Sequence, residues 1–307
     1  MLVLLAAAAV LGGASAAAPT GTWEKVRLRN AAAGCCSAQT ALSHSSYSNP
    51  VVLWVRPQVL LLDAVAKSGA RCLDGSPGGY YLRTHNAKGQ KADPNKWIVF
   101  MQGGGWCSSD ADCAGRAGTA LGSSTGWGPT YTDLYEGSET FAMNPFDSYT
   151  VVYGMYCDGG SWTGNSTPKQ VGGKTIYYRG RPLLDALLDD LLGKGLSGAT
   201  DLLWSGCSAG GLTTYVHADY VANRMPKTVK TLALADAMFS VESPTFSGAP
   251  GYPARMQWGY EAWNASASLN QKCVKALGGG AGNPDGWKVS LPCYMYRTAV
   301  AICRLHA

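Results

Sequence analysis

Residues 202–210 read Leu-Leu-Trp-Ser-Gly-Cys-Ser-Ala-Gly. The apolar residues 202–205 predict a buried strand, and the segment 209–225 predicts a helix. Ser208 therefore lies in a Gly-x-Ser-x-Gly match at a strand-to-helix turn. This is the context of a nucleophile elbow, which exposes the serine hydroxyl at the carboxyl edge of a sheet. We take Ser208 as the candidate nucleophile, with the N–H groups of the helix start facing the charge that develops during reaction.

Further strands and helices flank this stretch. Apolar runs at 97–101, 149–156 and 229–235 predict buried strands. Leucines between residues 183 and 192 recur at helical spacing. Strand and helix alternate along the chain, which predicts the α/β class with a mostly parallel sheet and helices on both faces.

Two other glycine-rich segments do not fit a catalytic role. A second Gly-x-Ser-x-Gly match covers 122–126, but no strand precedes it, so we interpret Ser124 as a structural serine in a loop. The segment 172–175 (Gly-Gly-Lys-Thr) resembles the end of a P-loop, but Pro168 occupies the position of the first glycine. Ser208 is therefore the preferred nucleophile position.

The segment Gly103-Gly104-Gly105-Trp106 is a candidate for the oxyanion hole. Hydrolases with a nucleophile elbow take one N–H from the residue after the nucleophile and another from an earlier strand–loop junction. This segment follows the predicted strand at 97–101 directly. Glycine allows close approach of the backbone to a substrate because it has no Cβ. A plain tight turn is the alternative, and the presence of Ser208 favours the oxyanion hole.

The composition is that of a folded protein. The 307 residues are 46% hydrophobic and 15% charged, enough for one large α/β domain or two smaller ones. The net charge of +5 would raise the on-rate for an acidic polymer, with ordinary surface bias as the alternative. No dense Lys/Arg run indicates a nucleic-acid partner. No later segment has about 18 uninterrupted apolar residues, so no membrane span is expected.

The N-terminus and the cysteines indicate secretion. An apolar run is followed by Ala14-Ser15-Ala16, so residues 1–16 are predicted to be a signal peptide. The ten cysteines fit an oxidising compartment. Cys107 and Cys113 lie close together with no histidine nearby, which favours a local disulfide over zinc. Glycosylation sequons begin at Asn165 and Asn264.

Several segments together resemble the pectin acetylesterase family, which includes the Notum-type carboxylesterases. They match in order and spacing, and the resemblance runs from about residue 58 to the end, so we assign 58–307 as one domain and leave 17–57 unassigned. The matching segments are Cys-Leu-Asp-Gly-Ser-Pro-Gly-Gly-Tyr-Tyr at 72–81, Gly-Gly-Gly-Trp-Cys at 103–107, Ala-Leu-Gly-Ser-Ser at 120–124, Tyr-Cys-Asp-Gly at 156–159, Gly-Cys-Ser-Ala-Gly-Gly at 206–211 and Leu-Ala-Asp at 234–236.

The resemblance implies a secreted α/β-hydrolase with a Ser-His-Asp triad that removes acetyl groups from a cell-wall polysaccharide, pectin or a related polymer. We expect a monomer in the extracellular space or cell wall, with no cofactor and no metal. By position it implies the following roles: Ser208 as nucleophile; Gly104, Gly105 and Ala209 as oxyanion N–H donors; Trp106 and Phe239 as pocket residues. A second disulfide, Cys273–Cys293, follows from short spacing and the same resemblance; the remaining connectivity is open.

The chain departs from the family after Cys293. There the family places its catalytic Asp on a strand, with the catalytic His later still, and we find neither motif before Ala307. We therefore expect a domain truncated at its C-terminus, with the last strands of the sheet missing. Neither His217 nor His306 substitutes well: the first lies about 13 Å from the nucleophile along the predicted helix, and the second is next to last. The match makes Asp236 a structural or pocket residue.

Three hypotheses follow. The chain is an acetylesterase whose full product carries the Asp and His; or it is a catalytically incomplete binding or vestigial product; or it is a deacylase for another ester, such as a lipidated protein. A serine without a base is a poor nucleophile at neutral pH, so an extension that carries an Asp strand and a late Cys-flanked His would exclude the second hypothesis.

Overall fold

The computed structural model describes residues 56–85, 89–131, 146–238, 247–248 and 252–276. The expected signal peptide and the segment 17–55 lie outside these residues. The first strand begins at Arg56, two residues before the predicted start of the domain.

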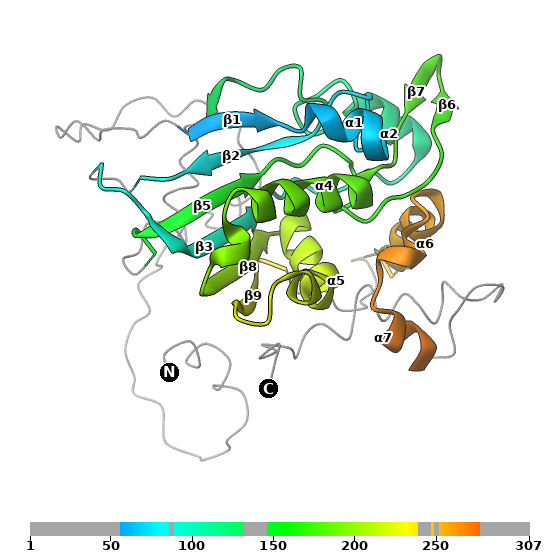
Figure 1. Ribbon diagram of the computed structural model, residues 1–307. Helices are drawn as coiled ribbons and strands as arrows, with labels where there is room; N and C mark the ends of the chain where they lie inside the picture. The colour runs from blue at the N-terminus through cyan, green and yellow to red at the C-terminus, as the bar shows by residue number, and fades with distance from the viewer. Residues whose placement is uncertain (1–55, 86–88, 132–145, 239–246, 249–251, 277–307) are drawn as a thin grey trace, which may run out of the picture. The chain divides into compact units, whose positions relative to one another are not determined.

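Seven strands of the described chain form one mixed sheet, in the order β4-β1-β2-β5-β3-β8-β9 (Figure 1). Strands β5, β3, β8 and β9 pair in parallel, whereas β4, β1 and β2 are antiparallel to their neighbours and β2 is antiparallel to β5. The strands are β1 (Arg56–Leu60), β2 (Gly79–Arg83), β3 (Asp93–Met101), β4 (Thr130–Tyr131), β5 (Tyr149–Gly154), β8 (Asp201–Cys207) and β9 (Lys230–Asp236). This mixed sheet with crossover helices is an α/β-hydrolase-like fold.

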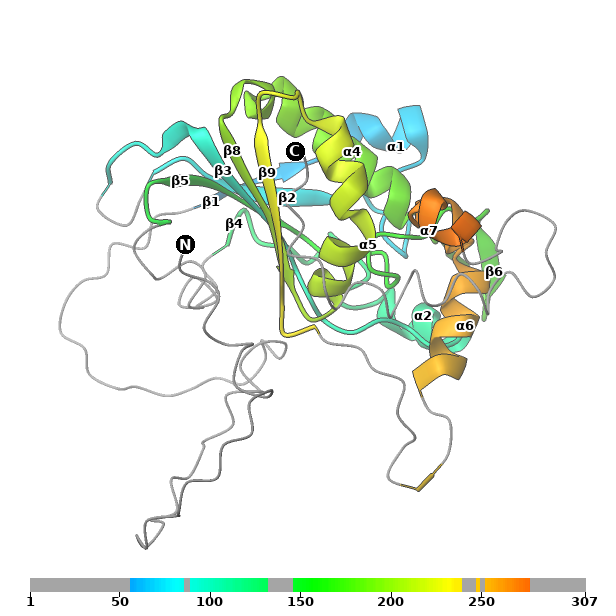
Figure 2. The same ribbon diagram turned by 90° about the horizontal axis from the view of Figure 1, so that it is seen from below.

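Two long helices cover one face of the sheet, α4 (Gly180–Gly193) and α5 (Ala209–Arg224), and α1 (Leu62–Ser68) lies beside α4 on the same side (Figure 2). Helix α4 packs on this face through the leucines that the sequence places at helical spacing. Leu183, Leu184, Leu187, Leu188 and Leu191 are all fully buried. They pack in one cluster with alternate residues of β3, Trp97, Val99 and Met101, because successive strand residues face opposite sides. Burial of each leucine contributes about 2 kcal/mol to stability.

The opposite face of the sheet carries aromatic side chains. Tyr131 stacks on Tyr81 and on Tyr153, with ring centroids 5.0 Å and 4.8 Å apart, and Tyr153 stacks on Phe100 at 5.6 Å. This cluster takes its members from strands and loops and none from a described helix. The sequence predicted helices on both faces. Within the described residues α1, α4 and α5 lie on one face, while the cluster on the other face comes from strands and loops.

The remaining elements gather around α2 (Asp110–Arg116). They are the hairpin of β6 (Lys169–Val171) and β7 (Lys174–Ile176), the helices α6 (Tyr252–Ala262) and α7 (Gln271–Ala276), and the short 3₁₀ helix η4 (Ala265–Ser268). The other 3₁₀ helix, η3 (Leu196–Gly198), instead packs beside α4 and β3. A second hydrophobic cluster joins α2, β7, α5 and α6 through Cys113, Ile176, Leu212 and Met256. No described helix combines the length and apolarity needed to cross a lipid bilayer.

Candidate active site

Ser208 lies between β8 and α5 in a backbone conformation with φ 56° and ψ −118°. A positive φ in a residue with a side chain costs about 1–3 kcal/mol, so the surroundings must impose it. A Cβ at Gly206 would lie 2.4 Å from the carbonyl oxygen of Gly210, and one at Gly210 would lie 1.9 Å from that of Met101. Both glycines of the motif are therefore required by space.

Main-chain hydrogen bonds hold the elbow on both sides. The N–H of Ser208 donates to the carbonyl oxygen of Asp236 at 3.0 Å, and the carbonyl oxygen of Ser208 accepts from the N–H of Leu212 at 3.0 Å. The first bond follows from the parallel pairing of β8 and β9, which sets Cys207 opposite Asp236. Asp236 therefore supports the elbow through its main chain.

The glycine turn after β3 lies against the elbow. Strands β3 and β8 are parallel with Met101 paired to Gly206, so both end at the same edge of the sheet. A Cβ at Gly103 would lie 2.3 Å from the carbonyl oxygen of Cys207 and 3.2 Å from the Cβ of Ser208. The structure thus brings together the two segments that the sequence singled out.

The expected oxyanion residues occupy this junction. Gly104 and Gly105 have φ values of 137° and 64°, which favour glycine. Ala209 is the first residue of α5 and is fully buried. The half-buried Trp106 packs against both the main cluster and the second cluster. Phe239, the other expected pocket residue, lies outside the described residues.

A disulfide joins Cys107, at the end of the glycine turn, to Cys113 on α2, with Cα atoms 5.1 Å apart. Helix α2 is capped by Ser109, whose side chain accepts from the N–H of Asp112 at 3.1 Å. Its first residue, Asp110, is ion-paired with Lys169 of β6 and accepts from the Tyr178 hydroxyl at 2.8 Å. The glycine turn is therefore fastened to a helix that is itself fixed at its start.

Asp158 organises the turn that follows β5. Its Oδ2 accepts from the N–H groups of Gly160 and Trp162 at 3.1 and 3.0 Å. Ser161 and Trp162 both have positive φ, and a Cβ at Gly180 would lie 2.1 Å from this carboxylate. Burial raises the pKa of Asp158 to about 7, against the lowering effect of the backbone N–H donors and of Arg116. The Asp-Gly-Gly sequence showed only that a strand ends here, so this structural role was not found from the sequence.

His217 is buried on α5, and its Nε2 donates to the carbonyl oxygen of Trp162 at 3.0 Å. Burial lowers its pKa to about 3, with a smaller effect in the same direction from Arg181. A neutral imidazole engaged in this way does not serve as a base for Ser208. His85 is exposed at a β-bridge with Lys91, and His44 and His306 lie outside the described residues. Among the described histidines, none faces Ser208 as a general base.

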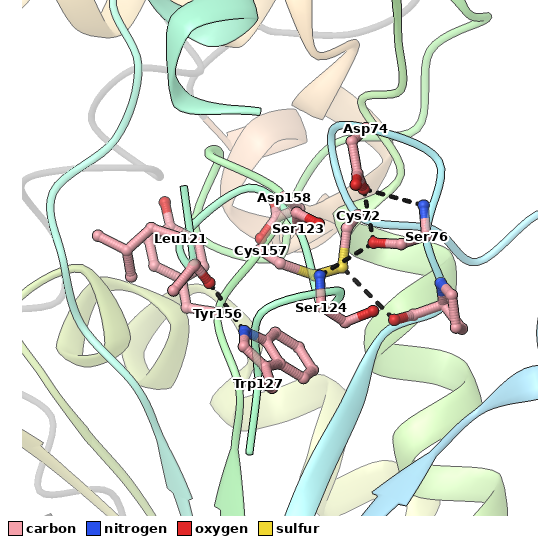
Figure 3. The surroundings of a disulfide bond; sticks show 12 residues. Cys72, Asp74, Ser76, Leu121, Ser123, Ser124, Trp127, Tyr156, Cys157 and Asp158 are labelled. Atoms are coloured by element: carbon pink, nitrogen blue, oxygen red, sulfur yellow. Dashed lines mark hydrogen bonds between the residues drawn. A yellow bond between two sulfur atoms is a disulfide. The ribbon is translucent and has the colours of Figure 1, made fainter. Parts of the chain in front are cut away.

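The second Gly-x-Ser-x-Gly match belongs to a structural loop (Figure 3). Ser124 is buried, and its N–H donates to the Oγ of Ser76 at 3.0 Å, while Ser76 donates to Asp74. Beside them a disulfide joins Cys72 to Cys157, at a sequence separation of 85. The sequence left this pairing open, although both cysteines lie in segments that resemble the family.

The remaining predicted modifications concern Cys273, Cys293 and two asparagines. Cys273 takes part in a disulfide, while Cys293 lies outside the described residues, so their pairing stays a prediction. Asn165 and Asn264 are both exposed. They are neighbours, because the Nδ2 of Asn264 donates to the carbonyl oxygen of Asn165 at 3.4 Å.

Comparisons with known proteins agree with this arrangement. A family model described as Pectinacetylesterase matches residues 55–296. Pectin acetylesterase 5 of Arabidopsis thaliana is 34% identical over 217 residues, which are 70% of this chain and 50% of the plant protein. The palmitoleoyl-protein carboxylesterase NOTUM of Homo sapiens is 31% identical over 195 residues, 61% of this chain and 38% of the human protein. The chain spans about half the length of the plant relatives it matches.

A solved structure supports the fold. The Wnt deacylase Notum from Drosophila aligns with a TM-score of 0.63 at 21% identity, covering 80% of this chain and 67% of that chain. At this identity the likeness bears on the fold alone, and it agrees with the mixed α/β-hydrolase-like sheet.

Proposed function

The chain belongs to the pectinacetylesterase family, and from this premise we propose that it is a secreted serine carboxylesterase that removes acetyl groups from pectin or a related cell-wall polysaccharide. The observation that carries the proposal is the contact between elbow and glycine turn, where a Cβ at Gly103 would lie 3.2 Å from the Cβ of Ser208. A nucleophile beside a glycine turn that can direct N–H groups to a substrate carbonyl is the arrangement that acyl transfer requires.

In the proposed reaction the Ser208 oxygen forms a bond to the acetyl carbonyl carbon, and the carbonyl oxygen becomes an oxyanion held by N–H groups of the glycine turn and of Ala209. The intermediate collapses with release of the sugar hydroxyl, which takes a proton, and leaves an acetyl group on Ser208. Water then hydrolyses this ester and acetate departs. The base that accepts the Ser208 proton would come from outside the described residues.

The chemistry of the chain is compatible with this substrate. Its net charge of +5 favours encounter with a polyanion such as pectin. The exposed sequon asparagines and the disulfides Cys72–Cys157 and Cys107–Cys113 support an extracellular setting. We propose that the enzyme acts there as a monomer without a cofactor.

A second candidate is a deacylase for a lipidated protein, which the 31% identity to the human carboxylesterase NOTUM favours. The acyl groups differ in size, so the two candidates differ in the pocket they need. The pectin acetylesterase relative is more similar over a larger share of the chain, which is why we place acetyl removal first.

The test is acetate release from acetylated pectin by the full chain produced through a secretory pathway. We expect release by the wild type and a loss of at least about 10⁴-fold in kcat for Ser208→Ala. Ser124→Ala is the matched control, since it alters the other Gly-x-Ser-x-Gly serine, and it should keep activity. Faster cleavage of a long-chain acyl ester than of acetyl pectin would favour the second candidate. No turnover of either ester by the folded wild type would refute both and leave a binding or vestigial product.

A further inference from the structure

Arg116, the last residue of α2, reaches back to the glycine turn. Its Nη2 donates to the carbonyl oxygen of Gly104 at 2.8 Å and lies 3.4 Å from that of Gly105. Its Nε donates to the carbonyl oxygen of Leu121 at 3.2 Å. One guanidinium therefore binds main-chain oxygens of the turn and of the loop that follows α2.

These contacts fix the direction of N–H groups. In a trans peptide the C=O and the N–H of the next residue point in opposite directions, because the group is planar. A hydrogen bond to the carbonyl of Gly104 therefore turns the N–H of Gly105 away from Arg116. The contact with the carbonyl of Gly105 does the same for the N–H of Trp106. Glycine backbones adopt many conformations, so a turn of three glycines needs such an external restraint.

The guanidinium is itself held on several sides. The disulfide Cys107–Cys113 ties the turn to the helix that carries Arg116. The guanidinium carbon lies 5.1 Å from the ring centroid of the buried Tyr156. The Leu121 side chain packs beside Gly104, where a Cβ would lie 2.9 Å from it, so the carbonyl groups that Arg116 binds are themselves confined. Arg116 is thus a fixed donor rather than a mobile surface cation.

The charge of Arg116 adds to the geometry. Hydrogen bonds from a charged donor are about twice as strong as those between neutral groups. A peptide whose carbonyl is bound by a cation is polarised, so its N–H becomes a stronger donor. Both effects favour an oxyanion on the opposite side of the glycine turn.

We propose that Arg116 is the positioning residue of the oxyanion hole, aiming and polarising the N–H groups of Gly105 and Trp106 toward the carbonyl oxygen of the bound ester. The proposal rests on the esterase function above and adds a residue that touches no substrate. Lysine should replace it poorly, because an ammonium has no planar fork with which to bind several carbonyls at once.

The test compares Arg116→Met and Arg116→Lys with Arg179→Met. Arg179 is a matched control, since its Nε and Nη2 donate to the carbonyl oxygens of Gly69 and Ser68 at 3.1 and 2.7 Å. We expect Arg116→Met to lower kcat by about 10- to 100-fold with KM nearly unchanged. Misdirecting an oxyanion donor should cost less than deleting it, and deletion costs about 10²–10³-fold in kcat. Arg116→Lys should recover a part of this loss, and Arg179→Met should leave kcat unaltered.

A second measurement does not depend on catalysis. Amide hydrogen exchange of the segment 103–107 should be faster in Arg116→Met than in the wild type and in Arg179→Met. If the wild type shows no esterase activity, the proposed function fails and this exchange measurement still decides the role of Arg116. Wild-type kcat in Arg116→Met, or unchanged exchange in 103–107, would overturn the inference while the esterase function stands.

Discussion

Asp158 and His217 bind opposite ends of the same residue. The N–H of Trp162 donates to Asp158 Oδ2 at 3.0 Å, and the carbonyl oxygen of Trp162 accepts from His217 Nε2 at 3.0 Å. Both titratable side chains are buried, one in the turn after β5 and the other on α5. Their effects on stability therefore depend on pH in opposite ways.

The pH dependence follows from the direction of each pKa. Burial raises the pKa of Asp158 from 3.8 to about 7. Between these pH values the folded protein keeps a proton that the unfolded chain has lost, so the free energy of unfolding falls as pH rises. Burial lowers the pKa of His217 from 6.5 to about 3. Between these pH values the unfolded chain binds a proton that the folded protein does not, so the free energy of unfolding falls as pH drops. From about pH 4 to 6.5 the two slopes oppose each other, each by about 1.4 kcal/mol per pH unit.

Single substitutions should reveal the two opposing pH dependences of the free energy of unfolding, one at a time. We expect the free energy of unfolding of Asp158→Asn to decrease as pH falls from 6.5 to 4, and that of His217→Gln to increase over the same interval. Urea unfolding at a series of pH values measures both. The double variant serves as the control and should show neither slope. Single variants that keep the wild-type pH profile would contradict the burial argument.

The elbow glycines should tolerate no side chain. Because a Cβ at Gly210 would lie 1.9 Å from the carbonyl oxygen of Met101, Gly210→Ala must displace β3 or the elbow. We expect loss of soluble protein or of the Ser208 activity. Gly193→Ala, at the end of α4 with no atom within 4 Å of the added Cβ, should stabilise the fold by about 0.5–1 kcal/mol. Thermal unfolding of both variants tests the contrast, and equal behaviour would refute it.

Asp236 should be dispensable for chemistry. It supports Ser208 through its main-chain carbonyl, which Asp236→Asn retains. We therefore expect a kcat within a few-fold of the wild type. If Asp236 oriented a catalytic histidine instead, the same change would cost about 10⁴-fold. Steady-state kinetics on acetylated pectin distinguish the two results.

The two disulfides should differ in what they stabilise. Closing the 85-residue separation of Cys72–Cys157 should contribute about 4–5 kcal/mol, and the separation of 6 in Cys107–Cys113 about 2 kcal/mol. Paired Cys→Ser variants measured by denaturant unfolding check this ratio. Removal of Cys107–Cys113 should also lower kcat, since it loosens the glycine turn. A larger stability loss from the short bridge would contradict the loop-entropy account.

The sequence predicted the parallel half of the sheet well. The apolar runs at 97–101 and 202–205 lie within β3 and β8, and the predicted helix at 209–225 is α5 to within one residue. The apolar runs of β3 and β8 are largely buried, and α4 carries a long leucine pattern, so the local sequence is enough to find these elements. The short strands β1 and β2 were missed, since they are held by pairing with distant partners rather than by a local apolar run.

The candidate site was predictable where the functional residues lie in short contiguous motifs. Ser208 and the glycine turn stand in motifs of neighbouring residues. Arg116 gave no such signal, because its partners Gly104 and Leu121 come together only when α2 folds back along the turn. The role of Asp158 was hidden for the same reason, since its contact with Gly180 joins two separate segments.

The spacing of the two bridges also sets an order of events during synthesis. Cys107 and Cys113 leave the ribosome almost together, so if the chain is secreted as proposed, their thiols can oxidise as soon as they reach an oxidising compartment. Cys72 must wait for another 85 residues, until β5 has been translated and Cys157 arrives. During that interval its thiol is open to wrong partners, including Cys107 and Cys113. Early closure of the short bridge removes these competitors and so favours the correct long-range pairing.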